Sequence, residues 1–215
     1  LFAISGGDRN LDVYKRLTGL HLPLVMLGHN TPGVPNISRV GVTEEKIAAT
    51  LVEFLRCNQV ESVSYLTFAE MVSNPISTRE QCIFRGLEEA GIRLESRHSV
   101  SCHRETVTEI RSLLANRRRP GALCCFTDEL ANSAVTALME CGSGVEELPV
   151  IGVDGLDMPF NALPLTSVRN PVEDIVFSGW QLFENALLHG KYASVELASH
   201  MVLRDTTPGF RLPER

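Results

Sequence analysis

The sequence lacks several features that would place it in a functional class at once. No apolar run approaches the ~18 residues that a transmembrane helix requires, which argues against a membrane-spanning protein. None of the six cysteines stands in a C-x-x-C pair and the six histidines are scattered, so we predict no metal site. The G-x-S-x-G, Walker and G-x-G-x-x-G motifs are missing, and no serine, cysteine or lysine stands beside a histidine as an activated nucleophile would. These absences favour ligand binding over catalysis and predict no cofactor.

The composition is that of an acidic, globular chain. It has 215 residues, with 20 Lys and Arg against 26 Asp and Glu and a net charge of −6. At roughly 150 residues per domain this length predicts one or two domains. The acidic balance argues against broad nucleic-acid binding by this polypeptide itself. A secreted disulfide framework is normally denser and the chain smaller, so we expect buried, reduced thiols in a cytoplasmic protein.

The sequence begins inside an apolar run and without Met, at Leu1-Phe2-Ala3-Ile4. This start is typical of a fragment, so we expect the beginning of the protein to be absent from the chain.

Short apolar, often β-branched runs alternate with stretches of helical periodicity. The predicted strands are 1–4, 23–27, 62–66, 121–125, 149–153 and 165–168. The predicted helices include 44–55, 79–90 and 128–139, each with apolar residues on one face. Strands that alternate with helices pair in parallel through right-handed crossovers, so the fold class is α/β, doubly wound.

Several helix ends are marked in the sequence. Ser77 and Glu80 form a capping box, and Asn170 precedes Pro171 as an N-cap precedes proline in a first turn. The Arg117-Arg118-Arg119 run is interpreted as the solvated end of a helix, where cations are favoured by the dipole. One more helix after Pro171 and a final strand at 195–203 suggest that the chain returns to an earlier layer.

Polar residues follow most of the predicted strands. In open parallel sheets, ligands bind beyond the carboxyl ends of the strands. The candidate ligand-binding residues at those positions are Ser5, Arg79, Thr127, Asp128, Asp154 and Asn170. Carboxylate, guanidinium and amide groups form directed or bidentate bonds, which suits hydroxyl-rich or anionic small molecules.

Five of these six residues also have a purely structural interpretation. Thr127 and Asp128 can cap a helix, Asn170 can cap the next one, and Asp154 with Gly155 can form a strand-end turn. Arg79 can be a solvated charge.

Five motifs follow one another in a recognisable order. They are STREQCIFRGLEEAGI, RPGALCCFTDELANSAVTALMECG, LPVIGVDG, LPLTSVRNP and MVLRDTT. In this order the chain, from Leu1 to about Thr207, resembles the effector-binding domain of the lactose/galactose repressor (LacI/GalR) family of bacterial transcription regulators. The resemblance implies the two-lobed type I periplasmic-binding-protein-like fold, with parallel sheets in each lobe and an incomplete N-terminal lobe that lacks its first βαβα portion.

The resemblance also implies roles for individual residues. Arg79 matches the arginine that contacts a sugar-like effector, although Cys82 and Ile83 replace the usual Gly and Phe. Thr127 and Asp128 match two positions that line the pocket, and Asp154 matches an acceptor for ligand hydroxyl groups. Asn170 corresponds to a polar residue of the same pocket.

The same resemblance implies the organisation of the whole regulator. The N-terminal lobe is expected to hold 1–60 and 169–196, the C-terminal lobe 61–168 and 197–207, with 208–215 as a tail. A sugar or sugar derivative in the interlobe cleft is expected to alter operator binding. The implied partners are operator DNA, bound through a DNA-binding head absent from this chain, and a second copy in a homodimer.

Two further hypotheses remain beside the regulator. A periplasmic solute-binding protein of a sugar transporter shares the fold but requires an export signal and tolerates internal cysteines poorly. An α/β enzyme would use Asp128 and Asp154 as acid/base or metal-binding carboxylates.

Overall fold

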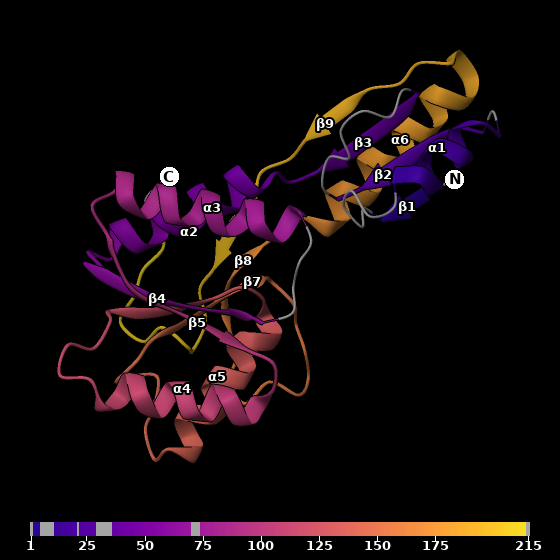
Figure 1. The fold of residues 1–215 in the computed structure, drawn as a ribbon. Coiled ribbons are helices and arrows are strands. Elements are labelled where there is room, and N and C mark those ends of the chain that lie inside the picture. Colours follow the sequence, from indigo (N-terminus) through magenta and orange to yellow (C-terminus); the bar gives the residue numbers. More distant parts are fainter. Residues whose placement is uncertain (1, 5–10, 21, 29–35, 70–73, 214–215) are drawn as a thin grey trace. The chain divides into compact units, whose positions relative to one another are not determined.

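The computed structural model describes residues 2–4, 11–20, 22–28, 36–69 and 74–213 (Figure 1). These residues form two compact units, which we describe separately. Unit 1 comprises 1–47, 72–79 and 170–199, and unit 2 comprises 48–71, 80–169 and 200–215. The α/β architecture predicted from the sequence is confirmed, with sheets dominated by parallel pairing.

Unit 1 is built on a four-stranded parallel sheet in the order β1-β2-β3-β9. Its strands are β1 (Phe2–Ile4), β2 (Leu24–Leu27), β3 (Ile37–Gly41) and β9 (Ser194–Glu196). Side chains of β2 alternate between two apolar clusters: Leu24 and Met26 pack with Tyr14 of α1 (Leu11–Thr18), whereas Val25 packs with Leu182 of α6 (Val172–His189). Within the described residues, one helix therefore packs on each face of this sheet.

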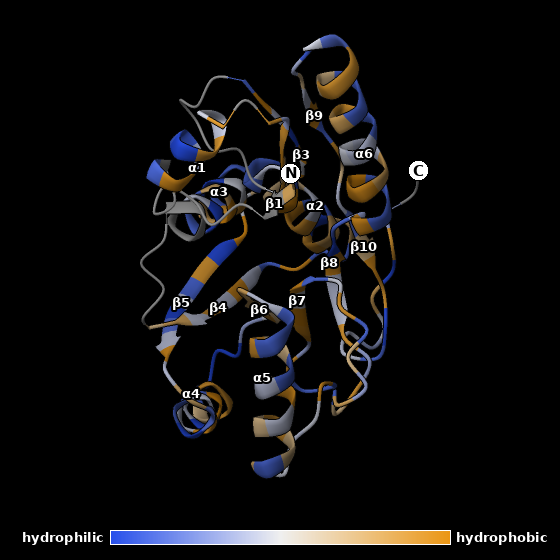
Figure 2. Cartoon of the chain, turned by 90° about the vertical axis from the view of Figure 1, so that its right-hand side faces the viewer, coloured by the Kyte–Doolittle hydropathy of each residue, from blue (hydrophilic) through white to orange (hydrophobic). Residues whose placement is uncertain are grey.

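Helix α6 keeps a large apolar surface in contact with solvent. Orange turns are visible along it in Figure 2, and its exposed apolar residues include Val176, Phe177, Trp180 and Leu188. The helix ends at Gly190, whose φ of 63° is the left-handed conformation that stops a helix at little cost.

Unit 2 is built on a six-stranded sheet in the order β10-β8-β7-β6-β4-β5, in which only the β10–β8 pair is antiparallel. Its strands are β4 (Ser62–Phe68), β5 (Arg93–Val100), β6 (Ala122–Cys125), β7 (Val150–Asp154), β8 (Thr166–Arg169) and β10 (His200–Val202). The helices with residues in this unit are α2 (Glu44–Cys57), α3 (Asn74–Glu89), α4 (His103–Ala115) and α5 (Asp128–Glu140). In Figure 1, α4 and α5 lie on one face of the sheet, and α2 and α3 lie on the other.

Two strands were not predicted. The strand β3 follows β2 closely in the sequence, and β5 ends the six-stranded sheet with mostly exposed side chains. The strand β5 is a charged edge strand without an apolar run, so the apolar pattern of the sequence does not indicate it.

The predicted final strand at 195–203 is in fact two strands in two sheets. Its first part is β9, parallel to β3 in unit 1, and its second part is β10, antiparallel to β8 in unit 2. The prediction of a single strand is wrong because residues 197–199 lie between the two.

Two other predicted boundaries lie elsewhere in the structure. Residues 48–60 group with unit 2 and residues 72–79 with unit 1, so the division at residue 60 does not match. The helix with the predicted N-cap Ser77 begins earlier, at Asn74, with Pro75 in its first turn. Residues 208–213 belong to unit 2, and Phe210 there packs against Phe54 at a ring distance of 5.7 Å.

Candidate functional site

The carboxyl edge of the unit 2 sheet is organised around a buried carboxylate, Asp128. Its side chain is 0% exposed at the start of α5. Oδ1 accepts a hydrogen bond from Ser167 Oγ at 2.6 Å, and Oδ2 accepts one from the Leu156 amide at 2.7 Å. Asp128 therefore ties β8 and the loop after β7 to the first turn of α5.

Two glycines make room for this arrangement. A Cβ on Gly152 would lie 2.1 Å from Asp128 Oδ1, so the carboxylate occupies space that a side chain would need. Gly155 has a φ of 71°, and a Cβ there would lie 2.4 Å from Arg169. Its amide donates to Ser167 Oγ at 3.0 Å. The backbone of β7 and of the turn after it is thus shaped by the contacts of Asp128 and Ser167.

Asp154, the last residue of β7, has a φ of 120°, which is a strained conformation for a residue with a side chain. Such strain costs about 1–3 kcal/mol and is characteristic of binding and catalytic sites. The turn held by Asp128 follows directly, at Gly155 and Leu156. The network therefore fixes the backbone that presents Asp154 at the end of the strand.

Two threonines complete the polar edge of unit 2. Thr127 is the N-cap of α5, with Oγ1 accepting from the Leu130 amide at 3.3 Å, so its structural interpretation is confirmed. Thr67 was not predicted: it is 1% exposed near the carboxyl end of β4, and its Oγ1 has no hydrogen-bond partner among the described residues. Its position, one residue before the end of the strand, is the signal in the sequence that could have identified it.

Arg79 lies in unit 1 and is paired with a buried carboxylate. Its Nε donates to Glu44 Oε2 at 2.6 Å and its Nη2 to Glu44 Oε1 at 3.3 Å. Both side chains are below 10% exposed, so Arg79 is not a solvated surface charge. This pair joins the first residue of α2 to α3, and sequence reasoning assigned no role to Glu44.

Asn170, also in unit 1, does not cap its helix as predicted. The N-cap residue of α6 is Pro171, whose side chain makes no capping hydrogen bond. The Oδ1 atom of Asn170 is buried without a hydrogen-bond partner among the described residues, which makes it a candidate group for a ligand. Ser5, the remaining predicted ligand residue, lies outside the described residues.

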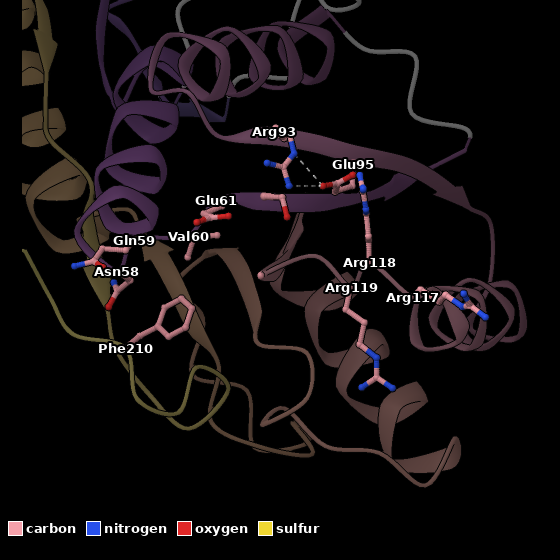
Figure 3. Close-up of a pocket in the computed structure, with 12 residues that line it drawn as sticks. Asn58, Gln59, Val60, Glu61, Arg93, Glu95, Arg117, Arg118, Arg119 and Phe210 are labelled. Atoms are coloured by element: carbon pink, nitrogen blue, oxygen red, sulfur yellow. Dashed lines mark hydrogen bonds and ion pairs between the residues drawn. The ribbon is translucent and has the colours of Figure 1, made fainter.

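A pocket lies at the opposite, amino edge of the unit 2 sheet (Figure 3). It has a volume of about 950 Å³ and is lined by four arginines, among them Arg93 and Arg119. Arg93 pairs with Glu95 at 3.0 Å, and Arg119 pairs with Glu147. Figure 3 shows Arg119 extending away from the Arg93–Glu95 pair. Because two of the four arginines are paired with carboxylates, and the run that ends with Arg119 follows the C-terminus of α4, where cations are favoured, the pocket needs no anionic ligand to explain its arginines.

Neither a metal site nor a membrane span is found in the described part of the chain. No three His, Cys, Asp or Glu side chains there are grouped as metal ligands would be. None of the described helices combines the length and the apolar character that crossing a membrane takes.

The burial of Asp128 predicts how unit 2 responds to pH. Burial raises the pKa of this carboxyl, and the hydrogen bonds from Ser167 and from the Leu156 and Gly155 amides lower it in part. An acid whose pKa is raised by folding adds stability below its unfolded pKa, about 3.9, and this contribution is lost as pH rises through the folded pKa. We therefore expect the stability difference between the wild type and Asp128→Asn to shrink as pH rises from about 3.5 to 7 in urea unfolding. A difference that stays constant with pH contradicts this assignment.

A comparison with known protein families identifies the family of the chain. A family model described as "Periplasmic binding protein-like domain" matches residues 52–207. The chain belongs to this family. No curated protein matches the chain.

Solved structures of this periplasmic-binding-protein-like fold match nearly the whole chain. A LacI family transcriptional regulator from Enterococcus faecium, solved with bound ribose, has a TM-score of 0.78 at 14% identity, with 98% of this chain and 80% of that chain covered. A LacI transcriptional regulator from Rhodococcus species has a TM-score of 0.75 at 18% identity, with 96% and 77% covered. An ABC transporter solute binding protein from Bacillus halodurans, with bound myo-inositol, has a TM-score of 0.72 at 15% identity, with 91% and 70% covered.

These likenesses confirm the type I periplasmic-binding-protein-like fold. The fold expected from the sequence motifs is therefore confirmed, and the family shown is that of the periplasmic-binding-protein-like domain.

Proposed function

We propose that the chain is the sugar-sensing domain of a cytoplasmic bacterial transcription regulator. The single observation that carries the proposal is the polar carboxyl edge of the unit 2 sheet, where Asp128 fixes the strained backbone of Asp154. Hydroxyl-rich ligands suit such an edge, because a carboxylate accepts directed hydrogen bonds from hydroxyl groups. The periplasmic-binding-protein-like family and the bound ribose and myo-inositol of structural neighbours support a sugar as the ligand.

The proposed roles of the residues differ. Asp154 accepts from ligand hydroxyl groups, and Thr127 lies beside it at the same sheet edge while capping α5. Asp128 is assigned to the ligand site as well, but both of its oxygens already accept protein donors, so its contribution is to position Asp154. Arg79 and Asn170 of unit 1 are each proposed as ligand contacts in their own right.

A calorimetric screen of pentoses, hexoses, inositols and sugar phosphates tests the ligand class. We expect one class to bind, and Asp154→Ala to weaken that binding by at least ~10-fold, since a hydrogen bond to a charged group contributes about 1.5–3 kcal/mol. Glu129→Ala is the matched control, because Glu129 is an exposed carboxylate in the first turn of α5. Equal loss in both variants, or none in Asp154→Ala, overturns the assignment of Asp154.

The regulatory part of the proposal includes operator DNA and a homodimer. DNA binding belongs to a head outside this chain, and a pseudo-palindromic operator requires two copies. The effector acts as inducer or corepressor, since linkage allows either sign. An operator-binding assay of the parent protein with and without the sugar tests the coupling; an affinity for operator that the sugar leaves unchanged contradicts it.

A solute-binding protein of a transporter is the second candidate, because one structural neighbour is such a protein. The coding sequence upstream of the chain distinguishes the two: a helix-turn-helix supports the regulator and an export signal supports the transporter. The six free cysteines favour the regulator. Cysteines normally form disulfides in an oxidising compartment, whereas thiols such as those of Cys124 and Cys125 stay reduced in the cytoplasm. We propose no enzymatic turnover of the sugar, and recovery of the bound sugar unchanged after prolonged incubation tests that statement.

A further inference from the structure

Three successive hydrogen bonds connect the unit 2 sheet to α4. Ser64 Oγ lies 2.8 Å from Ser96 Oγ, and Ser96 Oγ lies 2.7 Å from His98 Nε2. On the other side of the ring, His98 Nδ1 lies 2.5 Å from Glu109 Oε2. Ser96 and His98 are two residues apart on β5 and therefore share a face of the sheet, while Glu109 belongs to α4.

The donors and acceptors in this chain are consistent with one direction. A proton on His98 Nδ1 is donated to the Glu109 carboxylate, which leaves Nε2 as the acceptor for the Ser96 hydroxyl. Ser64, fully buried behind Ser96, then donates its own proton to Ser96 Oγ. This is the order of groups that activates a serine: hydroxyl to Nε2, and Nδ1 to a carboxylate.

The array is partly exposed to solvent. The His98 side chain is 14% exposed and Glu109 is 35% exposed, and Ser96 is only partly buried. The strand β5 is the last in the described sheet, and Val100 accepts from the Ala69 amide on the β4 side. In a parallel strand, the backbone groups of every second residue face the same neighbouring strand. The backbone groups of Ser96 and His98 therefore also bond toward β4, and the amide of Arg97 points to the other side of β5. In the activity proposed below, that amide, next to the serine, donates to the developing oxyanion.

We propose that Ser96 is a reactive nucleophile, activated by His98 and Glu109, that accepts the acyl group of small activated esters. Ser96 Oγ forms a bond to the carbonyl carbon while its proton passes to His98 Nε2. The bond from that carbon to the alcohol oxygen then breaks, and the proton on Nε2 leaves with the alcohol. Water, deprotonated by the same nitrogen, releases the acid and restores the serine, so the balance is one ester and one water to one acid and one alcohol. This activity is separate from sugar binding at the carboxyl edge.

A second serine, histidine and glutamate array in the same unit provides an internal comparison. His103 Nδ1 lies 2.8 Å from Ser133 Oγ, and Nε2 lies 3.0 Å from Glu140 Oε1. The ring is therefore turned the other way, with Nδ1 toward the serine, and the side chains of His103 and Glu140 are 42% and 51% exposed. A solvated array of reversed orientation is not expected to activate its serine.

Labelling with a fluorophosphonate, followed by peptide mass spectrometry, tests the proposal directly. Every protein in this experiment carries Cys102→Ala as a background substitution, because the exposed Cys102 thiol would itself react with aryl esters. We expect a single label on Ser96, and hydrolysis of p-nitrophenyl acetate to fall by ~10²-fold or more in His98→Gln, in the range that a general base contributes. Glu109→Gln is expected to lower the rate by a smaller factor, since it keeps the shape but not the charge beside the ring.

Ser133→Ala and Ser99→Ala are the controls, the first from the reversed array and the second from the same strand. Both are expected to retain the label and the rate, whereas Ser96→Ala loses both. A circular dichroism spectrum identical to that of the parent establishes that each variant is folded. Labelling of Ser133 equal to that of Ser96, or unchanged hydrolysis in folded Ser96→Ala, overturns the proposal.

Discussion

Replacing Gly152 by alanine is expected to destabilise unit 2 by about 3 kcal/mol or more. The added Cβ would lie 2.1 Å from Asp128 Oδ1 and 3.3 Å from the Ala131 side chain. Asp128 is fully buried and held by Ser167 and Leu156, so it moves only by giving up those hydrogen bonds. Each buried group left without a partner costs about 1–3 kcal/mol, which adds to the cost of the overlap itself.

Gly144→Ala is the matched control for this variant. A Cβ at Gly144 would lie 2.3 Å from Glu146 Oε2, the far end of a flexible side chain that can rotate away. We expect its effect to stay within about 0.5 kcal/mol, as for surface substitutions in general. The single tryptophan, Trp180, lies in unit 1, so urea unfolding of unit 2 is followed by circular dichroism. Equal midpoints for Gly152→Ala and the wild type would mean that Asp128 is not locked in place.

The same substitution is expected to weaken sugar binding in molecules that remain folded. Asp154 lies two residues after Gly152, and its backbone depends on the turn that Asp128 holds. A displaced turn moves the Asp154 carboxylate, and a misplaced acceptor loses the directed bonds that discriminate hydroxyl groups. The sugar dissociation constant of Gly152→Ala, measured well below its unfolding transition, is the readout for this effect.

The parts of the fold that sequence predicted share one physical property. The strands β4, β6 and β7 are buried on both faces, so they form continuous apolar runs that are visible without a structure. The edge strand β5 places Arg93, Glu95 and Arg97 in solvent and shows no such run. The division of 195–203 into β9 and β10 also escaped prediction, because two short strands separated by three residues share one local pattern.

The candidate site was predicted in outline for a different reason. Positions after parallel strands are recognisable, so Thr127, Asp128 and Asp154 were found from the strand ends alone. The sequence does not reveal which polar groups are already engaged inside the protein. Asp128 is bonded through both oxygens, whereas Asn170 leaves a buried oxygen without a partner among the described residues. Tertiary pairing, not residue type, separates a positioning group from one that remains for a ligand.

Breaking the ion pair of Arg79 and Glu44 is the second change that we expect to lower stability strongly. Both side chains are buried, and Arg79 donates to both carboxylate oxygens. Removing one partner of a buried pair costs about 3–5 kcal/mol, because the other charge stays in a low-dielectric environment without its counterion. Glu44→Gln is therefore expected to destabilise unit 1 by that amount in urea unfolding followed by Trp180 fluorescence. Glu45→Gln, a change of the neighbouring exposed carboxylate in the same helical turn, is the control.

The double variant Glu44→Leu with Arg79→Met separates stability from ligand binding. Replacing a buried pair by apolar groups of similar volume is often neutral, so most of the loss in the single variants is expected to be recovered. If Arg79 also contacts the sugar, the double variant remains folded yet binds it at least ~10-fold more weakly, the loss of one charged hydrogen bond. A folded double variant with wild-type affinity assigns Arg79 to the ion pair alone. The two measurements together distinguish a guanidinium that holds α2 to α3 from one that also recognises a ligand.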